Sequence, residues 1–469
     1  MTPLFTRLWQ HAKDRPDCVA FEIGDQSLTW AALAARVAGA AVALQQAPDT
    51  IGLALPNGPD YVIADLAATL AGKTLVPIPH FFGAGQIAHI IQDAGIKAMI
   101  GGADTTVPRL DPILTTTGTP MAPIPGHRRV IYTSGSSGQP KGVIIGASQI
   151  TASLNALSAA VGTSKSDVYL SVLPAAQLLE QICGIFLPVM AGARTVFSPS
   201  AMAALFAPAP GALAHAFAKH RPTMSLLAPQ LLAAWLGDID QGGTPPPESL
   251  RFVALGGAPA SPAMLQKALD AGIPVHEGYG LSEACSVVAM NRLGDNQPGT
   301  VGRVLDGLNV EIDAGEIVVS GPTVMQGYLH HPPVSNRWHT GDLGHFENGR
   351  LVIEGRKDNL IVTPAGRNIS PEWVETLVNA LPAIACSALV AGSNGLTLVI
   401  APTAPLGVAQ ILPLLAELPD YARPAHLVLA DPRKSGLIRP AGTPDRRVAQ
   451  RLAEAGPAVS IPSQKEPAA

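Results

Sequence analysis

The sequence has few cysteines, few charged residues and no long apolar run, and each scarcity excludes a class of protein. Its four cysteines are far apart and form no C-x-x-C pair, which argues against a zinc site and against a disulfide framework. Charged residues make up only 14% of the chain and the formal net charge is −4, so no basic surface for nucleic acid is expected. The most apolar internal run, residues 182–193, contains Pro188 and is too short to span a bilayer.

The chain has instead a composition suited to a large folded core. Hydrophobic residues make up 47% of its 469 residues, which indicates a globular rather than a disordered chain. Residues 1–17, MTPLFTRLWQHAKDRPD, lack an apolar core of signal-peptide length, and we expect an amphipathic helix there. We therefore expect a cytoplasmic protein with no membrane span and no nucleic-acid partner, and residues 182–193 should form buried interior.

Strand-like and helix-like patterns alternate through the first two thirds of the chain. VAFEIGDQSLTW, residues 19–30, predicts two strands around a Gly-Asp turn, and large apolar residues then recur at helical spacing over residues 31–44. The alternation continues to residue 101 and resumes from residue 130 to about residue 288, after an exposed connection rich in Thr and Pro at 105–127. Such alternation is typical of βαβ units and parallel sheets.

The pattern changes in the last third of the chain. Residues 309–353 show short strands and Gly-rich turns, and a separate block with a helix at 370–381 follows. We predict an α/β protein with a large N-terminal domain, residues 1–355, of parallel-rich sheets with flanking helices plus a β-rich section. A small, mobile α+β C-terminal domain should cover residues 356–455, with a disordered tail at 456–469.

The most informative short stretch is YTSGSSGQPKGV, residues 132–143. It follows the strand-like segment RRVIYT, so its backbone amides would lie at a sheet edge, where they can form an anion-binding concavity. Pro140 and Gly142 flank Lys141, so the stretch is not a G-x-x-x-x-G-K-[ST] nucleotide loop. A flexible Gly/Ser linker is the alternative, but a linker has no need for Pro-Lys-Gly at its end.

This stretch closely resembles the phosphate loop of the adenylate-forming superfamily, which includes acyl-CoA synthetases, peptide-synthetase adenylation domains and luciferases. Further blocks follow in the family's order: GGAPAS (256–261), GYGLSEA (278–284), GEIVVSGPTVMQGY (315–328), HTGDLG (339–344) and GRKDNLIVTPAGRNISPEWVE (355–375). The middle blocks look more like acyl-CoA synthetases than like peptide-synthetase domains. The resemblance implies activation of a small carboxylic acid with ATP and Mg²⁺ to an acyl-adenylate. The acyl group would then pass to coenzyme A or, as the alternative, to the phosphopantetheine of an acyl carrier protein.

The resemblance also implies which residues bind the nucleotide. Those expected to grip the β and γ phosphates are Thr133, Ser134, Gly135, Ser136, Ser137, Gly138 and Lys141. The other expected nucleotide-binding residues are Gly256, Gly257, Ala258, Tyr279, Gly280, Ser282, Asp342 and Arg356.

Several of these side chains have a chemistry that suits the task. The face of Tyr279 can stack on adenine, Ser282 can donate to the α-phosphate, and Glu283 can hold magnesium. Asp342 can accept hydrogen bonds from both ribose hydroxyls, and Arg356 matches an arginine that also reaches the ribose. Taken alone, Tyr279 would be a core aromatic, Glu283 a solvated charge and Arg356 a surface arginine. The expected catalytic residues are Lys141, Ser282 and Glu283, together with Thr443, which stands where the superfamily has a lysine.

Two positions near the C-terminus complete the comparison with the superfamily. Asp358 falls where these enzymes place a hinge about which the small domain swings. The family carries Asn-Gly-Lys-x-Asp-Arg further on, whereas this chain reads RPAGTPDRR at 439–447, so Thr443 stands at the lysine position. Loss of one such charge stabiliser typically costs about 3 kcal/mol, or about 10²–10³ in rate. Lys434 is a candidate to reach inward in its place.

Thr443 leaves three alternatives open. The chain is a less efficient adenylating enzyme, an enzyme that transfers a preformed acyl-adenylate to a thiol or another nucleophile, or a degenerate homologue that binds nucleotide or adenylate without catalysis.

The residues expected in the acyl pocket are Gln177, Gly256 and Gly278. LPAAQLLEQICG, residues 173–184, resembles the segment in which acyl-CoA synthetases often have His after Leu-Pro, and Gln177 stands there instead. Its LPAAQ portion contains no Asp to hold an amino group, so an apolar acyl or aryl carboxylate is favoured over an amino acid. Glu180, in the same segment, is expected to be a charge on a helix surface.

Overall fold

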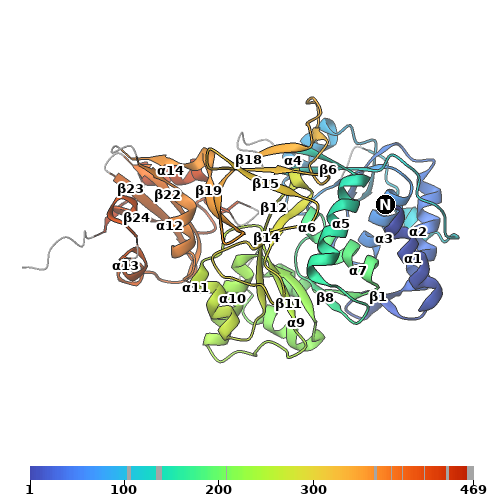
Figure 1. The fold of residues 1–469 in the computed structure, drawn as a ribbon, viewed down its shortest axis with the longest axis horizontal. Coiled ribbons are helices and arrows are strands. Elements are labelled where there is room, and N and C mark those ends of the chain that lie inside the picture. The colour runs from blue at the N-terminus through green and yellow to red at the C-terminus, as the bar shows by residue number, and fades with distance from the viewer. Residues whose placement is uncertain are drawn as a thin grey trace, which may run out of the picture.

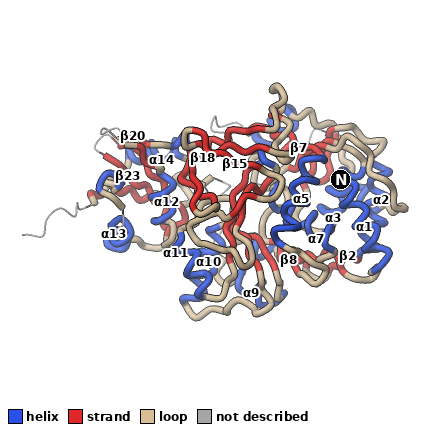
Figure 2. Tube along the Cα trace, viewed as in Figure 1, coloured by secondary structure: helices blue, strands red, loops and turns tan. Residues whose placement is uncertain are grey.

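The computed structural model describes residues 1–102, 107–133, 140–206, 209–363, 367–381, 383–392, 395–416, 418–439 and 443–461. Figure 1 shows an elongated molecule in which the last hundred residues, orange to red, form one end and the first helices form the other. In Figure 2 strands run through the middle of the molecule, with helices along its outside.

A six-stranded sheet carries the predicted phosphate loop. Its order is β17 (Gly327–Tyr328), β7 (Lys141–Gly146), β6 (Arg128–Thr133), β4 (Thr74–Pro77), β3 (Thr50–Ala54) and β5 (Ala98–Gly101). The four strands from β6 to β5 are parallel, whereas β7 and β17 add antiparallel neighbours at one edge. Its helices are α2 (Trp30–Leu44), α3 (Pro59–Leu70) and α4 (Ala84–Asp93), and the 3₁₀ turn η1 (Asp111–Thr115) follows β5.

Both faces of this sheet are covered by helices. Adjacent residues of a strand point to opposite faces, so each strand contributes to both sides. On β4, Leu75 packs into the main hydrophobic core with α2 and α3, whereas Val76 packs into a second cluster with Ile90 of α4. The expected βαβ units and parallel sheet are therefore confirmed for residues 50–101.

A nine-stranded sheet forms the second layer. Its order is β14 (Arg303–Val304), β13 (Ser286–Met290), β12 (Val275–Leu281), β11 (Phe252–Leu255), β10 (Met224–Leu227), β8 (Val168–Ser171), β9 (Arg194–Phe197), β1 (Val19–Ile23) and β2 (Gln26–Thr29). The strands from β12 to β1 are parallel. The expected hairpin at residues 19–30 is confirmed as β1 and β2, but it joins this sheet beside β9 rather than the sheet of the βαβ units that follow it.

Helices surround the nine-stranded sheet. They are α1 (Thr2–Asp14), α5 (Ala147–Val161), α6 (Leu178–Glu180), the π-helix η2 (Gln181–Phe186), α7 (Leu187–Ala191), α8 (Pro199–Ala203), α9 (Ala212–His220), α10 (Pro229–Asp240) and α11 (Pro262–Asp270). The expected N-terminal amphipathic helix is α1, which buries Leu4, Phe5 and Leu8. The apolar run at 182–193 forms η2 and α7 and is largely buried, as expected.

The β-rich section expected at residues 309–353 is confirmed. It is an antiparallel sheet of β15 (Asn309–Asp313), β16 (Glu316–Ser320), β18 (Arg337–Glu347) and β19 (Arg350–Arg356). Val310, Ile317, Val319 and Leu351 form its own apolar core with residues that follow β12.

The C-terminal part has separate apolar cores on the two faces of one sheet. Its elements are β20 (Ile361–Val362), β21 (Asn368–Ile369), α12 (Pro371–Val378), β22 (Ile384–Gly392), β23 (Gly395–Pro402), α13 (Val408–Ala416), the 3₁₀ turn η5 (Asp420–Ala422), β24 (His426–Leu429), α14 (Arg446–Ala455) and β25 (Val459–Ser460). Helices α12 and α13 cover one face of the β22–β25 sheet, and α14 covers the other.

These elements confirm the predicted fold class, with parallel-rich sheets, a β-rich section and a small α+β unit. Part of the expected disordered tail is paired, because β25 extends the last sheet beside β24. Residues 462–469 lie outside the described part of the chain. Among the described helices, none combines the length and the apolarity needed to cross a bilayer.

Candidate active site

The glycine-rich stretch closes a β-hairpin. Thr133 at the end of β6 pairs with Lys141 at the start of β7, and the two strands are antiparallel neighbours. The predicted phosphate-binding residues between them lie outside the described residues: Ser134, Gly135, Ser136, Ser137 and Gly138. The strand expected before this stretch is confirmed as β6. The paired strands therefore hold Thr133 and Lys141, the residues at the two ends of the stretch, next to each other.

A buried ion pair fastens β6 to helix α3. The side chains of Arg129 and Asp65 are both fully buried, and two guanidinium nitrogens each donate to one carboxylate oxygen. Arg129 also donates to Gln181 Oε1 at 2.8 Å and to Thr69 Oγ1 at 2.9 Å. This network joins the strand that leads into the hairpin to both α3 and η2.

Three residues predicted to bind the nucleoside meet at one place. The Tyr279 hydroxyl donates to Asp342 Oδ2 at 2.6 Å, and Arg356 Nη1 donates to Asp342 Oδ1 at 2.9 Å. Burial raises the pKa of Tyr279 and the charge of Asp342 raises it further, so the phenol keeps its hydrogen. Burial also raises the pKa of Asp342, against the opposing effects of Tyr279 and Arg356. A carboxylate has further lone pairs, so Asp342 can still accept from ligand hydroxyls.

Glu283 and Lys141 share a neighbour that was not predicted, Tyr328. The Tyr328 hydroxyl donates to Glu283 Oε1 at 2.7 Å, and Lys141 Nζ lies 5.8 Å from the centroid of the Tyr328 ring. Burial raises the pKa of Tyr328 and the hydrogen bond to Glu283 raises it further, so this hydroxyl is a donor. Tyr328 is the last residue of the block GEIVVSGPTVMQGY, and its place in that block was the one sequence feature that could have indicated a role at the site.

Glu283 is the candidate magnesium ligand. Within the part of the chain that the structure describes, no group of three or more His, Cys, Asp or Glu side chains is placed to hold a metal ion. Mg²⁺ usually binds through one or two carboxylates together with substrate phosphates. One carboxylate close to the base of the hairpin fits that pattern.

A tight turn presents Ser282 and Glu283. These residues form a short 3₁₀ turn, η3 (Ser282–Ala284), and the next two residues, Cys285 and Ser286, have positive φ values of 52° and 90°. Such conformations cost about 1–3 kcal/mol each and are found where the surroundings enforce them. A Cβ on Gly280 would lie 1.9 Å from the Ser286 carbonyl oxygen, so only glycine fits this close approach of β12 and β13.

A cavity of about 310 Å³ opens beside Tyr279. Phe252, Ala254 and His276 belong to its floor, which is one face of β11 and β12, and residues of α5 and η2 form its walls. The predicted residues that line it are Gln177, Gly256, Gly257, Ala258, Gly278, Tyr279, Gly280 and Ser282. The predicted acyl pocket and part of the predicted nucleotide site therefore share one cavity. Thr133, Lys141, Glu283, Asp342 and Arg356 are not among its lining residues.

Glu180 is a buried carboxyl group, so its expected place on a helix surface is wrong. Its side chain is 1% exposed and accepts hydrogen bonds from the hydroxyls of Tyr169, at 2.9 Å, and Ser171, at 2.5 Å. Burial raises the pKa of Glu180 from 4.5 to about 8, against the lowering effect of these two bonds. Local sequence pattern does not reveal this burial, because the hydroxyl partners come from β8.

Replacing Glu180 with glutamine is expected to make the protein less sensitive to alkaline pH. The raised pKa means that the fold favours the protonated acid. That contribution is complete below pH 4.5 and is lost as the pH rises through about 8. The difference in free energy of unfolding between the variant and wild type should therefore shift in the variant's favour by roughly a few kcal/mol when the pH is raised from about 5 to about 9. Denaturant titrations at both pH values measure the gain. The exposed Glu248→Gln serves as the control, and an equal gain there would contradict the expectation.

The motif residues around Thr443 build the small C-terminal unit. Asp445 caps α14 by accepting from two backbone N–H groups of its first turn, at 3.0 and 3.2 Å. Arg446 donates to Glu375 at 2.7 and 2.9 Å and to Glu372 at 2.9 Å, which ties α14 to α12. The Asp-Arg of the motif therefore has a structural task that does not depend on position 443.

Thr443 lies just before this cap. Its carbonyl oxygen accepts from the Arg439 backbone N–H at 2.9 Å, and Gly442 lies outside the described residues. Lys434 is exposed in a preceding turn, where its backbone N–H donates to Asp431 at 3.1 Å. That Lys434 reaches the site in place of the superfamily's lysine stays a prediction.

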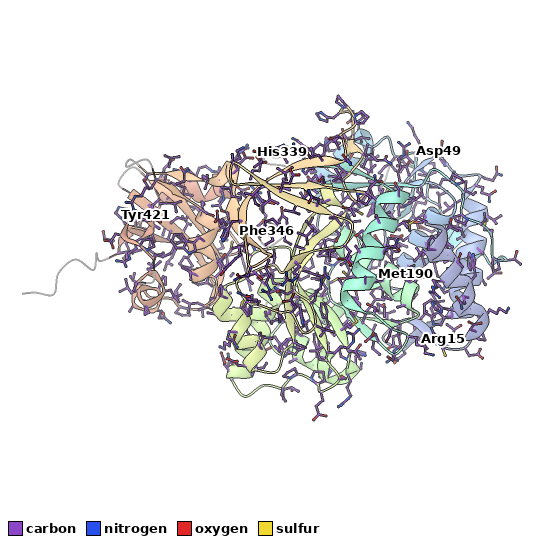
Figure 3. The ribbon with its side chains drawn as sticks, viewed as in Figure 1. Arg15, Asp49, Met190, His339, Phe346 and Tyr421 are labelled. Carbon is purple, nitrogen blue, oxygen red and sulfur yellow. The ribbon has the colours of Figure 1, made fainter. Side chains whose placement is uncertain are left out.

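The expected hinge residue lies in a short connection between β19 and β20. Asp358 is exposed in the 3₁₀ turn η4 (Lys357–Asn359). Lys357 Nζ donates to Glu316 Oε2 at 3.0 Å, and His339, labelled in Figure 3, lies 3.6 Å from the same oxygen. The connection is therefore held to the β-rich section on one side of Asp358.

Comparison with known proteins identifies relatives of the chain. A family model described as AMP-binding enzyme matches residues 8–125 and 128–329. The 2-succinylbenzoate–CoA ligase of Bacillus subtilis (strain 168) is 27% identical over 421 residues, which cover 81% of this chain and 83% of the relative.

Solved structures share the fold. O-succinylbenzoate coenzyme A synthetase (MenE) from Bacillus subtilis, in complex with ATP and magnesium ion, matches with a TM-score of 0.77 and 24% identity, over 91% of this chain and 95% of that one. The anthranilate CoA ligase AuaEII, in complex with anthranoyl-AMP, matches with a TM-score of 0.84 and 18% identity, over 96% and 97% of the two chains.

Proposed function

The chain belongs to the AMP-binding enzyme family, and on this premise we propose that it is an AMP-forming acid–thiol ligase. It uses ATP and Mg²⁺ to convert a carboxylic acid to an acyl-adenylate and transfers the acyl group to coenzyme A. The observation that carries the proposal is that Tyr279, which lines the cavity, hydrogen-bonds to Asp342, which in turn accepts from Arg356. The name of the Bacillus subtilis relative and the ligands of the solved structures support it.

The proposed nucleotide site extends from the hairpin to β19. The backbone amides near Thr133 and the ammonium group of Lys141 bind the β and γ phosphates, Tyr279 stacks on adenine, and Asp342 and Arg356 hold the ribose. Gly256, Gly257, Ala258 and Gly280 supply close backbone approach to the adenosine, and Ser137 and its loop neighbours add donors. In this arrangement Asp342 accepts from the ribose hydroxyls while Tyr279 and Arg356 fix its orientation.

In the proposed first step, a carboxylate oxygen of the acid attacks the α-phosphorus and the bond to pyrophosphate breaks. Ser282 donates to the α-phosphate, and Lys141 stabilises the charge that develops on the departing pyrophosphate. Glu283 holds Mg²⁺, which neutralises phosphate charge. In the second step the thiolate sulfur attacks the acyl carbon and AMP leaves with the bonding electron pair.

We propose that the two steps use different positions of the C-terminal unit. The large domain spans residues 1–355, the lid spans residues 356–455, and the chain swings about Asp358. Support comes from the separate apolar cores of the last hundred residues and from the exposure of Asp358. Gln177, Gly256 and Gly278 belong to the acid pocket of the large domain.

A second candidate function is that of a homologue that binds nucleotide or acyl-adenylate without forming it. Thr443 favours this candidate, because its uncharged side chain replaces a lysine of the superfamily. The phosphopantetheine of an acyl carrier protein is the alternative acceptor. Since both candidate functions use an adenine nucleotide or acyl-adenylate, we propose a cytoplasmic location.

Incubation with ATP, Mg²⁺, coenzyme A and a panel of carboxylic acids tests the proposed reaction. Mass spectrometry is expected to find AMP and one or more acyl-CoA thioesters. Formation of ADP in place of AMP, or binding of neither ATP nor AMP, would contradict the proposed function.

Asp342→Asn is expected to weaken ATP binding by about 10-fold or more, because a hydrogen bond to a charged group is worth about 1.5–3 kcal/mol. Isothermal titration with Mg·ATP measures the effect. Asp313→Asn, exposed at the end of β15 in the same sheet, is the matched control. Affinity within about twofold of wild type in Asp342→Asn would remove Asp342 from the site.

A further inference from the structure

The charges of the side chains around the cavity beside Tyr279 determine which acid tails it can hold. No lysine or arginine lines it in the part of the chain that the structure describes. The sequence places none in residues 103–106, 134–139 or 207–208 either. Most of the lining is apolar, with a few uncharged polar groups such as Gln177 and Gln230.

Among the described residues of this lining, the single Asp, Glu, Lys or Arg is Asp167, at the end of the cavity remote from Tyr279. It precedes β8, whereas Tyr279 lies near the carboxyl end of β12, and these two strands run in the same direction. Arg251 pairs with both Asp167 oxygens at 2.8 Å, and Thr223 donates to one of them at 2.7 Å. Burial alone would raise the pKa of Asp167, but these hydrogen bonds lower it to about 2, so the carboxyl group is ionised. Ser164 also donates to Asp167 Oδ2, from its backbone N–H at 2.7 Å and from its hydroxyl at 3.1 Å, so both carboxylate oxygens already have partners.

His276 supplies a lone pair rather than a positive charge. Its Nδ1 lies 2.8 Å from the Pro274 carbonyl oxygen, which can only accept, so Nδ1 carries the hydrogen and Nε2 is an acceptor. Its ring stacks on Phe252, with centroids 4.3 Å apart and planes 16° apart. Burial lowers the pKa of His276, which keeps the ring neutral.

The sheet floor sets the depth of the cavity. Gly256 and Gly257 put no side chain into the cavity near Tyr279, and nothing lies within 4 Å of where a Cβ on Gly257 would stand, whereas Met224 and Phe252 line the remote end. Phe252 and Gly256 are four positions apart along β11 and the residue after it, which corresponds to about 13 Å of extended chain. This depth suits an aryl acid with a short side chain or an acyl chain of medium length.

Building on the proposed function, we propose that this cavity selects acids with one carboxylate and an uncharged tail. It rejects a dicarboxylic acid such as 2-succinylbenzoate, the acid in the name of the Bacillus relatives. One carboxylate of the acid meets the α-phosphate. A second carboxylate would be buried in a lining whose described residues include no lysine or arginine, and an uncompensated buried charge is strongly unfavourable.

Three non-reactive adenylate mimics test the selection without requiring catalysis. Each is a 4-oxo-4-phenylbutanoyl sulfamoyl-adenosine that carries hydrogen, a methyl ester or a carboxylate at the ortho position of the ring. Isothermal titration of the full chain is expected to show that the two neutral mimics bind at least about 100-fold more tightly than the carboxylate mimic. Equal or tighter binding of the carboxylate mimic would overturn the inference.

AMP titrated alone separates this inference from the proposed function. If AMP binds but none of the three mimics does, the acid cavity is wrongly assigned and the inference fails, while the nucleotide site stands. If neither AMP nor any mimic binds, the proposed function fails and the inference fails with it.

A pair of variants tests whether charge is the cause of the selection. Gln177→Arg adds a cation to the lining, and Gln177→Met is the uncharged control. The arginine variant should reduce the preference for the neutral mimics by at least about 10-fold, and the methionine variant should keep the wild-type ratio. An unchanged ratio in Gln177→Arg would show that charge does not select the acid and would overturn the inference.

Discussion

Replacing Thr443 with lysine is expected to raise the acid-dependent exchange of pyrophosphate into ATP by about 10²–10³-fold. Thr443 stands at the position where the superfamily has a lysine that bridges the carboxylate and the α-phosphate. An ammonium group there would stabilise charge that develops at phosphorus, which a threonine hydroxyl cannot neutralise. The measurement is the exchange of labelled pyrophosphate into ATP with a panel of carboxylic acids.

The substitution should leave the fold intact. Thr443 is half-buried in a loop, and the neighbouring motif residues Asp445 and Arg446 hold α14 in place. Thr443→Met adds a side chain of similar length without charge and is the matched control. Equal rates in Thr443→Lys and Thr443→Met would contradict the expectation.

The same experiment separates the two candidate functions. Exchange by wild type supports a ligase that tolerates Thr443. Exchange only in Thr443→Lys indicates that the adenylating step has been lost from an otherwise complete site. Lys434→Met, tested in wild type, shows whether that exposed lysine contributes, because its loss should then lower the rate.

Asp65→Asn is expected to lower the free energy of unfolding by about 3–5 kcal/mol, because it leaves the buried guanidinium of Arg129 without its counter-charge. Both side chains are fully buried, so water cannot replace the lost partner. The local consequence should be greatest at β6, which carries the hairpin. Equilibrium unfolding in urea, followed by circular dichroism, measures the loss.

Asp60→Asn on the same helix is the control. Asp60 also pairs with an arginine, Arg36, but its side chain is 59% exposed, and exposed pairs contribute about 0–1 kcal/mol. Replacing both buried partners, as in Asp65→Leu with Arg129→Met, should recover much of the loss, since no unpaired charge remains. A similar loss in Asp60→Asn and Asp65→Asn would contradict the expected role of burial.

Local patterns were sufficient for many elements of this fold. Periodicity predicted the β1–β2 hairpin and the βαβ units, and the change to Gly-rich turns predicted the β-rich section. The sheet that receives the hairpin was not predictable in this way, because Phe21 pairs with Thr195, far along the chain. Pairing at such separation depends on packing of the whole domain rather than on local alternation.

The candidate site shows the same division. Ordered motifs identified Tyr279, Asp342 and Arg356 as one group, and the structure brings them into contact, although their roles toward nucleotide stay predictions. Tyr328 and Glu180 were missed, because their significance lies in contacts with other elements. A Tyr at the end of a block and a Glu in an apolar helix carry no local mark of those partners.

The division of tasks within RPAGTPDRR has an evolutionary consequence. Asp445 and Arg446 secure the last long helix through their side chains, whereas Thr443 contributes a backbone carbonyl that any residue supplies, so we expect folding to tolerate other side chains at 443. A single base change converts some threonine codons to lysine codons. An ancestral lysine at this site, or its return in a descendant, would therefore require neither an intermediate that misfolds nor a compensating mutation elsewhere.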